Sequence, residues 1–236
     1  MFVSEGCIKE MPKGGYLHRL RERDPNWKPV EIQRPRKPEP TPPDWNALIA
    51  MYCEAVEYEK AKAMADGLGV SVESLDLLDC GYMGGNKWSF PMYDFARHPV
   101  GMRTRCEDGT KRSITGSKNG LFIPKRRRDG YLFFVEGPTD CCAVLDIGFD
   151  CIGRPACYGC EEWCAELSRG RETVIIADND KSEVGRAGAD KAAKVIRKTA
   201  RWLKIVYSPY LKDVREWKKN GATRDSLMAV VNCASG

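Results

Sequence analysis

Beyond Gly130 the sequence alternates between short apolar runs and amphipathic segments, and this alternation constrains the fold more than any other feature. The apolar runs predict strands at 131–135, 150–152, 173–177 and 203–207. The segments that follow them predict helices at 139–146, 161–167, 188–200, 213–218 and 224–231. Strands that alternate with helices at this spacing predict an α/β fold built on a parallel sheet. Ligands of such sheets bind beyond the carboxyl ends of the strands, so the residues after each strand are the first candidates for function.

Acidic residues follow two of these strands. Glu136 precedes Gly137 and Pro138, where the chain must turn, and Asp178 and Asp180 follow the run 174–177. Asp178 and Asp180 alternate, so a continued strand would point both carboxylates to one face. Two such carboxylates repel each other unless a cation lies between them. We therefore predict a site for a hard divalent cation and phosphoryl chemistry, with a polar Asp- and Asn-rich loop as the alternative.

Asp140 lies four residues after Glu136, at the start of a predicted helix. Two roles are open for its carboxylate. It can cap the backbone N–H groups of that helix, or it can point into the acidic site.

Positive charge gathers just before the acidic residues. The net charge is only +5, but one segment holds a dense set of cations, at Arg103, Arg105, Lys111, Arg112, Lys118 and 125–128. A cationic block beside a metal site suits a polyanion that is held on one side and acted on at the other. A solvated charged surface is the alternative.

The cysteines and the apolar runs indicate the cellular setting. No run reaches the roughly 18–20 apolar residues of a membrane span, and the N-terminus lacks a signal-peptide pattern, which predicts an intracellular protein. Cys157, Cys160 and Cys164, with Cys151 nearby, could bind zinc. With only two histidines and no second CxxC pair, buried reduced thiols are the preferred interpretation, and zinc is not expected.

Three regions are predicted along the chain. Residues 1–43 are rich in Pro and charge and predict a linker or the remnant of another unit. Residues 44–130 predict a small basic α+β subdomain, in which Asp44 caps a helix that runs to about Ala65 and Ser71 caps a shorter one. Residues 131–236 form the parallel-sheet domain.

The acidic spacing resembles a known family. The segments 135–140, 176–181 and 212–213 resemble the Toprim domain of bacterial replicative primases, type IA topoisomerases and related nucleases. The segments 88–94, 100–105, 109–111 and 116–122 are similar to the basic subdomain that precedes Toprim in those primases and in phage primase–helicases. The resemblance covers residues 66–225 and implies a Toprim-like sheet domain preceded by the basic α+β subdomain.

The resemblance implies a DNA primase core, a nucleotidyltransferase that makes short RNA primers on single-stranded DNA from ribonucleoside triphosphates. Glu136 would be a metal ligand or the acid/base residue, and Asp178 and Asp180 would bind Mg²⁺ or Mn²⁺. Asp140 and Asp213 would complete the acidic cluster. Template phosphates or the triphosphate would be held by Arg103, Arg105, Lys111, Arg112, Lys118, Lys181 and Lys212.

The chain also departs from the family pattern. The sequence given shows neither the zinc-module motif nor the helicase region of such primases, which is expected either of a minimal mobile-element or phage protein or of the core of something longer. A replicative helicase and a separate zinc module are the partners that the resemblance implies. The expected setting is the cytoplasm of a bacterium, or of a cell that holds a phage or another mobile element. The alternative functions are a Toprim nuclease or topoisomerase-like enzyme, and a nucleic-acid-binding adaptor that has lost catalysis.

Overall fold

A computed structural model describes residues 7–10, 16–18, 41–156, 159–178, 183–209 and 211–234 of the 236-residue chain. The chain divides into two compact units, Met1–Pro38 and Glu39–Gly236. In the first unit, β1 (Cys7–Glu10) and β2 (Tyr16–His18) form an antiparallel pair. The Pro-rich part of the predicted linker, at 19–40, lies outside the described residues.

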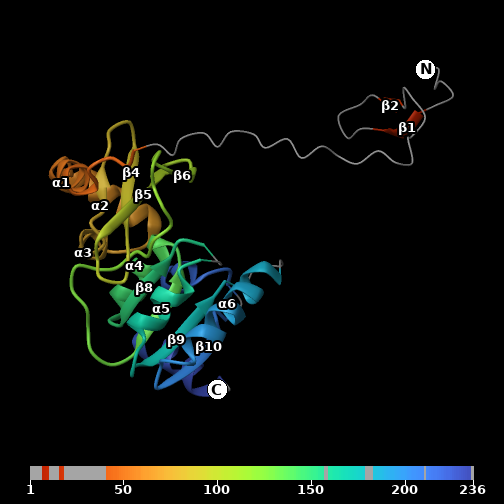
Figure 1. Ribbon diagram of the computed structural model, residues 1–236. Coiled ribbons are helices and arrows are strands. Elements are labelled where there is room, and N and C mark those ends of the chain that lie inside the picture. The colour runs from red at the N-terminus through yellow and green to blue at the C-terminus, as the bar shows by residue number, and fades with distance from the viewer. Residues whose placement is uncertain are drawn as a thin grey trace. The chain divides into compact units, whose positions relative to one another are not determined.

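The second unit contains the predicted parallel sheet, so the predicted α/β class is confirmed (Figure 1). Its strands are β7 (Leu132–Glu136), β8 (Asp150–Arg154), β9 (Glu172–Ala177) and β10 (Trp202–Tyr207). They are parallel and lie in the order β10-β9-β7-β8. The helices are α4 (Pro138–Ile147), α5 (Glu161–Leu167), α6 (Glu183–Ile196), α7 (Val214–Lys219) and α8 (Arg224–Cys233). Helix α6 begins at Glu183 rather than at residue 188.

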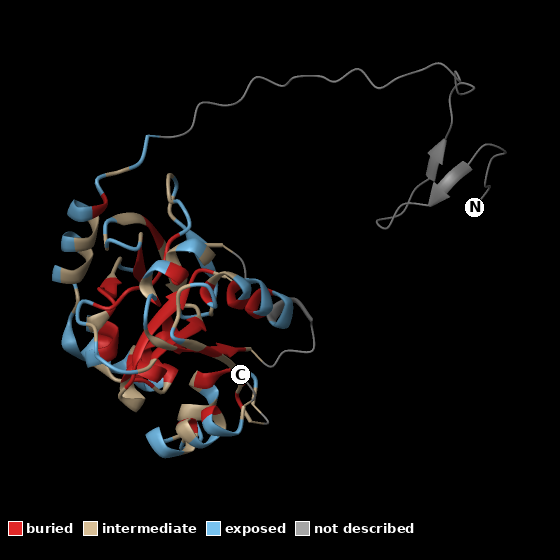
Figure 2. Ribbon diagram, turned by 60° about the horizontal axis from the view of Figure 1, so that its bottom comes forward, coloured by how far each residue is buried: buried red, intermediate tan, exposed pale blue. Residues whose placement is uncertain are grey.

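Both faces of the parallel sheet are covered. Phe133 and Val135 belong to one buried cluster, whereas Leu132 and Phe134 belong to a second cluster on the opposite face. Because successive side chains of a strand point to opposite faces, a sheet buried on both sides needs an unbroken apolar run. Figure 2 shows the buried residues concentrated along these strands.

Upstream, the chain folds into a second sheet flanked by helices. The helices are α1 (Trp45–Glu54), α2 (Tyr58–Leu68) and α3 (Val72–Leu77). The strands are β3 (Gly81–Tyr82), β4 (Lys87–Tyr93), β5 (Pro99–Cys106) and β6 (Lys111–Ser113), antiparallel and in that order. The caps predicted at Asp44 and Ser71 are present, with each side chain accepting the N–H three residues on.

The single helix predicted from Asp44 to Ala65 is wrong, because the structure has two helices there. Helix α1 ends at Glu54, and Glu57 takes an extended conformation as the N-cap of α2. Val56, between the two helices, packs against the core. The apolar spacing continues across this break, so periodicity alone does not reveal it.

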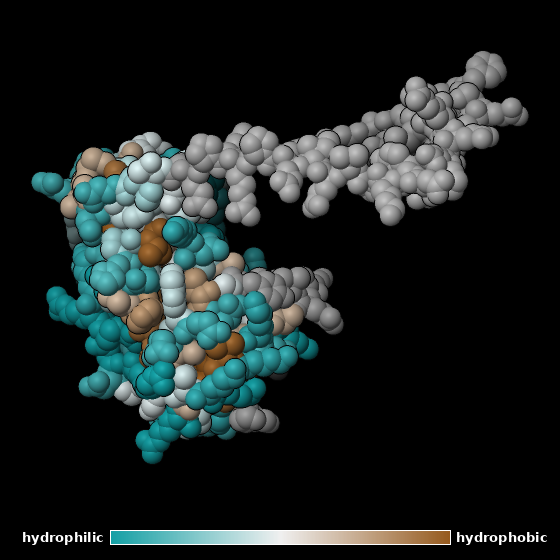
Figure 3. Space-filling view, viewed as in Figure 1, coloured by the Kyte–Doolittle hydropathy of each residue, from teal (hydrophilic) through white to brown (hydrophobic). Residues whose placement is uncertain are grey.

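The two sheets share one core. Trp88 and Phe90 of β4 lie in the same buried cluster as Phe133 of β7 and Val144 of α4. An antiparallel bridge from Phe122 to Gly153 also joins the segment after β6 to β8. Across the face seen in Figure 3, hydrophilic residues predominate and apolar ones form small separate patches. Within the described residues, no helix has both the length and the apolar character needed to cross a bilayer.

Candidate active site

Two predicted acidic residues lie at the carboxyl edge of the parallel sheet. Glu136 is the last residue of β7 and Asp178 directly follows β9, which pairs with β7. Both side chains are half-buried. Asp180 and Lys181 lie outside the described residues.

Two glycines allow the chain to turn closely at this edge. Gly137 has φ +81°, in the left-handed region that favours glycine, and its N–H donates to the Arg154 carbonyl at 2.8 Å. A Cβ on Gly153 would lie 2.5 Å from the Gly137 carbonyl oxygen. The end of β8 therefore packs directly on the turn that carries Glu136 into α4.

The side chain of Asp140 caps a helix, but not its own. The N-cap of α4 is Gly137, which makes no side-chain cap, whereas Asp140 Oδ1 accepts the Arg215 N–H of α7 at 3.3 Å. Asp213 is the N-cap of α7, and its Oδ1 accepts the Glu216 N–H at 2.7 Å. Two carboxylates therefore take up free N–H groups at the start of α7.

The surroundings of Asp140 disfavour its charged form. Its side chain is buried, and this burial, together with the nearby charges of Asp213 and Asp178, raises the pKa of Asp140 to about 7. The charge of Arg215 and its N–H bond oppose this rise. Three of the predicted acidic residues are thus close enough to affect one another, and a proton or a cation would relieve their repulsion.

As the side chains stand, no group of three or more His, Cys, Asp or Glu residues within the described part of the chain is placed to hold a metal ion. The donor set at this edge nevertheless consists of carboxylate oxygens, which suit Mg²⁺ and Mn²⁺ in type.

Arginines that the sequence analysis did not identify accompany the carboxylates. The Nη2 atom of Arg215 in α7 lies 3.7 Å from Asp213 Oδ2. Arg154 is buried at the end of β8, in register with Glu136. Matching the ends of neighbouring predicted strands could have identified Arg154, but Arg215 required the contact between α4 and α7.

The predicted basic residues occupy different settings. Arg105 lies near the acidic cluster: burial lowers its pKa, the charge of Arg215 lowers it further, and Asp140 opposes the shift. Arg103 donates to the Pro155 carbonyl at 2.9 Å and so ties β5 to the segment after β8. The remaining predicted residues that the structure describes are exposed, namely Lys111, Arg112, Lys118 and Lys212.

The basic run 125–128 mainly supports the fold. Lys125 pairs with Asp76 at 2.9 Å, Arg127 pairs with Asp150, and Arg128 donates to the Leu145 carbonyl. The density of positive charge predicted that this run binds a polyanion. In the structure, these three side chains instead contact other parts of the fold.

The cysteines near α5 are thiols with raised pKa values. Burial raises the pKa of Cys151 and Cys164, and it raises the pKa of the half-buried Cys160 to about 11. Zinc binds the thiolate form, which these surroundings disfavour. Cys157 lies outside the described residues.

Comparison with known proteins places the fold. No protein-family model matches the sequence, and no curated protein matches it. The catalytic core of the Escherichia coli primase is 15% identical, with a TM-score of 0.61 over 80% of this chain and 78% of that chain. The DnaG primase catalytic domain bound to single-stranded DNA is 14% identical, with a TM-score of 0.64 over 80% and 79%.

A phage protein is similar as well. The primase fragment of the bacteriophage T7 primase–helicase is 20% identical, with a TM-score of 0.55 over 70% of this chain and 72% of that chain. The chain therefore has the fold of the catalytic core found in bacterial DnaG primases and in the primase fragment of bacteriophage T7.

Proposed function

We propose that this chain is the catalytic core of a DNA primase, a nucleotidyltransferase that makes short RNA primers on single-stranded DNA. One observation carries the proposal: in a primase-core fold, Asp140 at the start of α4 lies close enough to Asp178 and Asp213, and to the cationic side chains of Arg215 (α7) and Arg105 (β5), for their charges to affect one another. Nucleotidyl transfer needs both kinds of group, because carboxylates hold the divalent cation and arginines neutralise the triphosphate.

The acidic residues would hold Mg²⁺ or Mn²⁺. We assign this role to Glu136, Asp178 and Asp180, with Asp140 and Asp213 completing the cluster. The raised pKa of Asp140 supports the assignment, because burial and the neighbouring carboxylates of Asp213 and Asp178 all disfavour its charged form, and a bound cation would offset these effects. When bound, the cation supplies charge stabilisation to the phosphoryl oxygens during in-line displacement.

Side chains of this protein would transfer the proton and bind the phosphates and the template. As the alternative to binding the cation, Glu136 at the end of β7 would take the proton of the attacking 3′ hydroxyl. Arg105 and Arg215 would face the phosphates, where their charges balance those of the carboxylates. The exposed residues assigned to the template backbone are Arg112, Lys111, Lys118 and Lys212. Arg103 and Lys181 are proposed to assist in the same contact.

Primer synthesis tests the proposal directly. The protein is incubated with single-stranded DNA, labelled ribonucleotides and Mg²⁺ or Mn²⁺. Short RNA products that Asp178→Ala abolishes, and that the exposed control Asp190→Ala leaves in place, would support the primase. Cleavage of the DNA without synthesis would favour the Toprim nuclease or topoisomerase-like alternative. Salt-sensitive DNA binding without either activity would favour the adaptor.

We also propose that a replicative helicase and a separate zinc module direct this core to its template, in the cytoplasm of a bacterium or an infected cell. The support is the likeness to the primase fragment of a primase–helicase. Adding the purified helicase should raise the yield of primers from a long template, and an unchanged yield would count against this partnership.

A further inference from the structure

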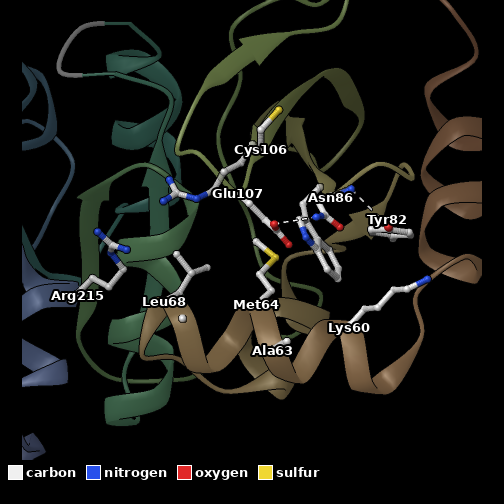
Figure 4. Close-up of a pocket in the computed structure, with 12 residues that line it drawn as sticks. Lys60, Ala63, Met64, Leu68, Tyr82, Asn86, Cys106, Glu107 and Arg215 are labelled. Atoms are coloured by element: carbon white, nitrogen blue, oxygen red, sulfur yellow. Dashed lines mark hydrogen bonds between the residues drawn. The ribbon is translucent and has the colours of Figure 1, made fainter.

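A pocket of about 350 Å³ opens beside the proposed active site. Helix α2 forms its floor, and the ends of β3, β4 and β5 form its walls (Figure 4). One end lies at Lys60 and Tyr82, and the other end reaches Arg215 of α7. The pocket therefore extends from a part of the molecule with no assigned role to the edge of the acidic cluster.

The end of the pocket away from the active site is suited to a flat, apolar ligand. Tyr82 and Trp88 form a tilted aromatic pair with ring centroids 5.1 Å apart, and Met64 of α2 also lines the pocket. Lys60 Nζ lies 4.8 Å from the centroid of Tyr82, so the ring also takes part in a cation–π contact. Aromatic rings and a thioether are common partners for a nucleobase, because every base has a π-face.

A polar pair stands in the middle of the pocket. Asn86 Nδ2 donates to Glu107 Oε2 at 2.8 Å, and Figure 4 shows the Glu107 side chain directed toward Asn86 above Met64. Asn86 has φ +58°, which fixes its position in the turn between β3 and β4. The pair presents carboxylate acceptors next to an amide that can both donate and accept.

This combination of groups matches guanine best. Guanine carries two neighbouring N–H donors, at N1 and N2, beside the O6 acceptor. A carboxylate can accept from both donors while an amide donates to O6. Adenine, cytosine and uracil do not present two adjacent donors on one edge, so none of them can make the same set of hydrogen bonds with the exposed Asn86–Glu107 pair.

The opposite end of the pocket is cationic. Arg105 and Arg215 line it, and each interacts with a carboxylate of the acidic cluster. A phosphate attached to a base in the pocket would meet these guanidinium groups next to the proposed metal ligands.

We propose that this pocket binds a guanine nucleotide, with the base against Met64, Tyr82 and Trp88. Glu107 and Asn86 would read the edge of the base. The phosphate would face Arg105 and Arg215. The choice of a nucleotide as the ligand rests on the proposed primase function. A free ribonucleoside triphosphate and a guanine within single-stranded DNA share this chemistry.

Binding measurements on the full chain test the proposal and separate the two sources. GTP and ATP carrying a fluorescent ribose label are titrated in one arm, and labelled oligo-dT strands with one central dG or dA in the other. We expect a guanine preference of about tenfold in at least one arm. Glu107→Gln should remove the preference, because Gln places a donor where guanine needs an acceptor.

Two further variants sharpen the result. Asn86→Gly keeps the left-handed backbone and removes the amide, so it should reduce the preference by a smaller factor. Glu59→Gln removes the same charge from an exposed position of α2 outside the pocket lining, so it should leave the preference unchanged.

The outcomes are distinct. Guanine preference with GTP identifies the incoming nucleotide, and preference only with the dG strand identifies the template. Equal binding of guanine and adenine in both arms, or a full preference retained in Glu107→Gln, would overturn the proposal. If the protein showed a guanine preference but made no primers, the proposed primase function would be rejected and the proposal of a guanine-binding pocket would stand.

Discussion

Two buried aspartates at opposite ends of the parallel sheet show how one residue type serves two purposes. Asp150 begins β8 at the amino end of the sheet and is fully buried. Arg127 donates to it through Nε at 2.9 Å and Nη2 at 2.7 Å, and Arg171 forms a second ion pair. Asp140, at the carboxyl end, has two carboxylates as neighbours and a pKa raised to about 7.

The surroundings of these two aspartates affect the stability of the folded state in opposite ways. A buried carboxylate surrounded by donors is a structural element, because its charge is compensated in the folded state. A buried carboxylate beside other carboxylates destabilises the folded state, and such sites are retained where chemistry needs them. The amino end of this sheet therefore has the character of a structural region, and the carboxyl end is the one to which we assign the proposed function.

The largest expected effect is on catalysis at the functional end. Asp178→Ala should reduce primer synthesis on the order of 10³-fold, because it removes a carboxylate that we propose as a ligand of the catalytic cation. Its melting temperature should stay close to that of the parent protein. A variant that loses both activity and folding would show that the two ends of the sheet do not differ as argued.

The next effect is on stability at the structural end. Asp150→Ala should lower the free energy of unfolding by about 3 kcal/mol, because it leaves Arg127 and Arg171 without their carboxylate. Urea unfolding followed by circular dichroism measures the loss. Asp225→Ala, at an exposed position in the first turn of α8, is the control and should change stability by less than about 0.5 kcal/mol.

The pH dependence of stability should reveal Asp140. Its pKa is about 7 in the folded state and about 3.9 in an unfolded chain, so the unfolded state loses the proton first as pH rises. Stability from this group is therefore full below about pH 4 and falls until about pH 7. Without metal, Asp140→Asn should become more stable relative to the parent protein by on the order of 2 kcal/mol between pH 5 and pH 8.

Added Mg²⁺ should shrink that difference, because a cation that binds only the folded parent protein stabilises it. If the free energies of unfolding of the two proteins changed with pH in the same way from pH 5 to pH 8, the raised pKa of Asp140 would be contradicted.

The sequence was sufficient for the sheet and for one edge of the site. Both faces of β7 and β9 are buried, so their apolar runs are continuous and their ends are sharp, which put Glu136 and Asp178 at the ends of two neighbouring strands. The hydrogen bond that the Arg215 N–H donates to Asp140 could not be predicted, because it joins residues 75 positions apart. That contact depends on how α4 packs against α7, which local periodicity does not encode.

Charge density was the least informative pattern. Arg127 belongs to the densest basic run, yet its side chain is directed to Asp150 inside the fold, whereas Lys111 and Arg112 on β6 are exposed. A count of cations along the chain does not say on which side of an element each one projects. Only the packing separates structural arginines from those available to a polyanion.

The smallest expected effect tests this separation. Lys111→Gln should weaken binding to single-stranded DNA by a few-fold and reduce the slope of log K against log salt by roughly 0.7, with little change in stability. Arg127→Gln should do the reverse, because its partner is Asp150 rather than a phosphate. Fluorescence anisotropy at several salt concentrations, paired with urea unfolding, measures both quantities. If Arg127→Gln changed the salt slope as much as Lys111→Gln, the basic run would contact nucleic acid after all, and the structural end of the sheet would also be a binding surface.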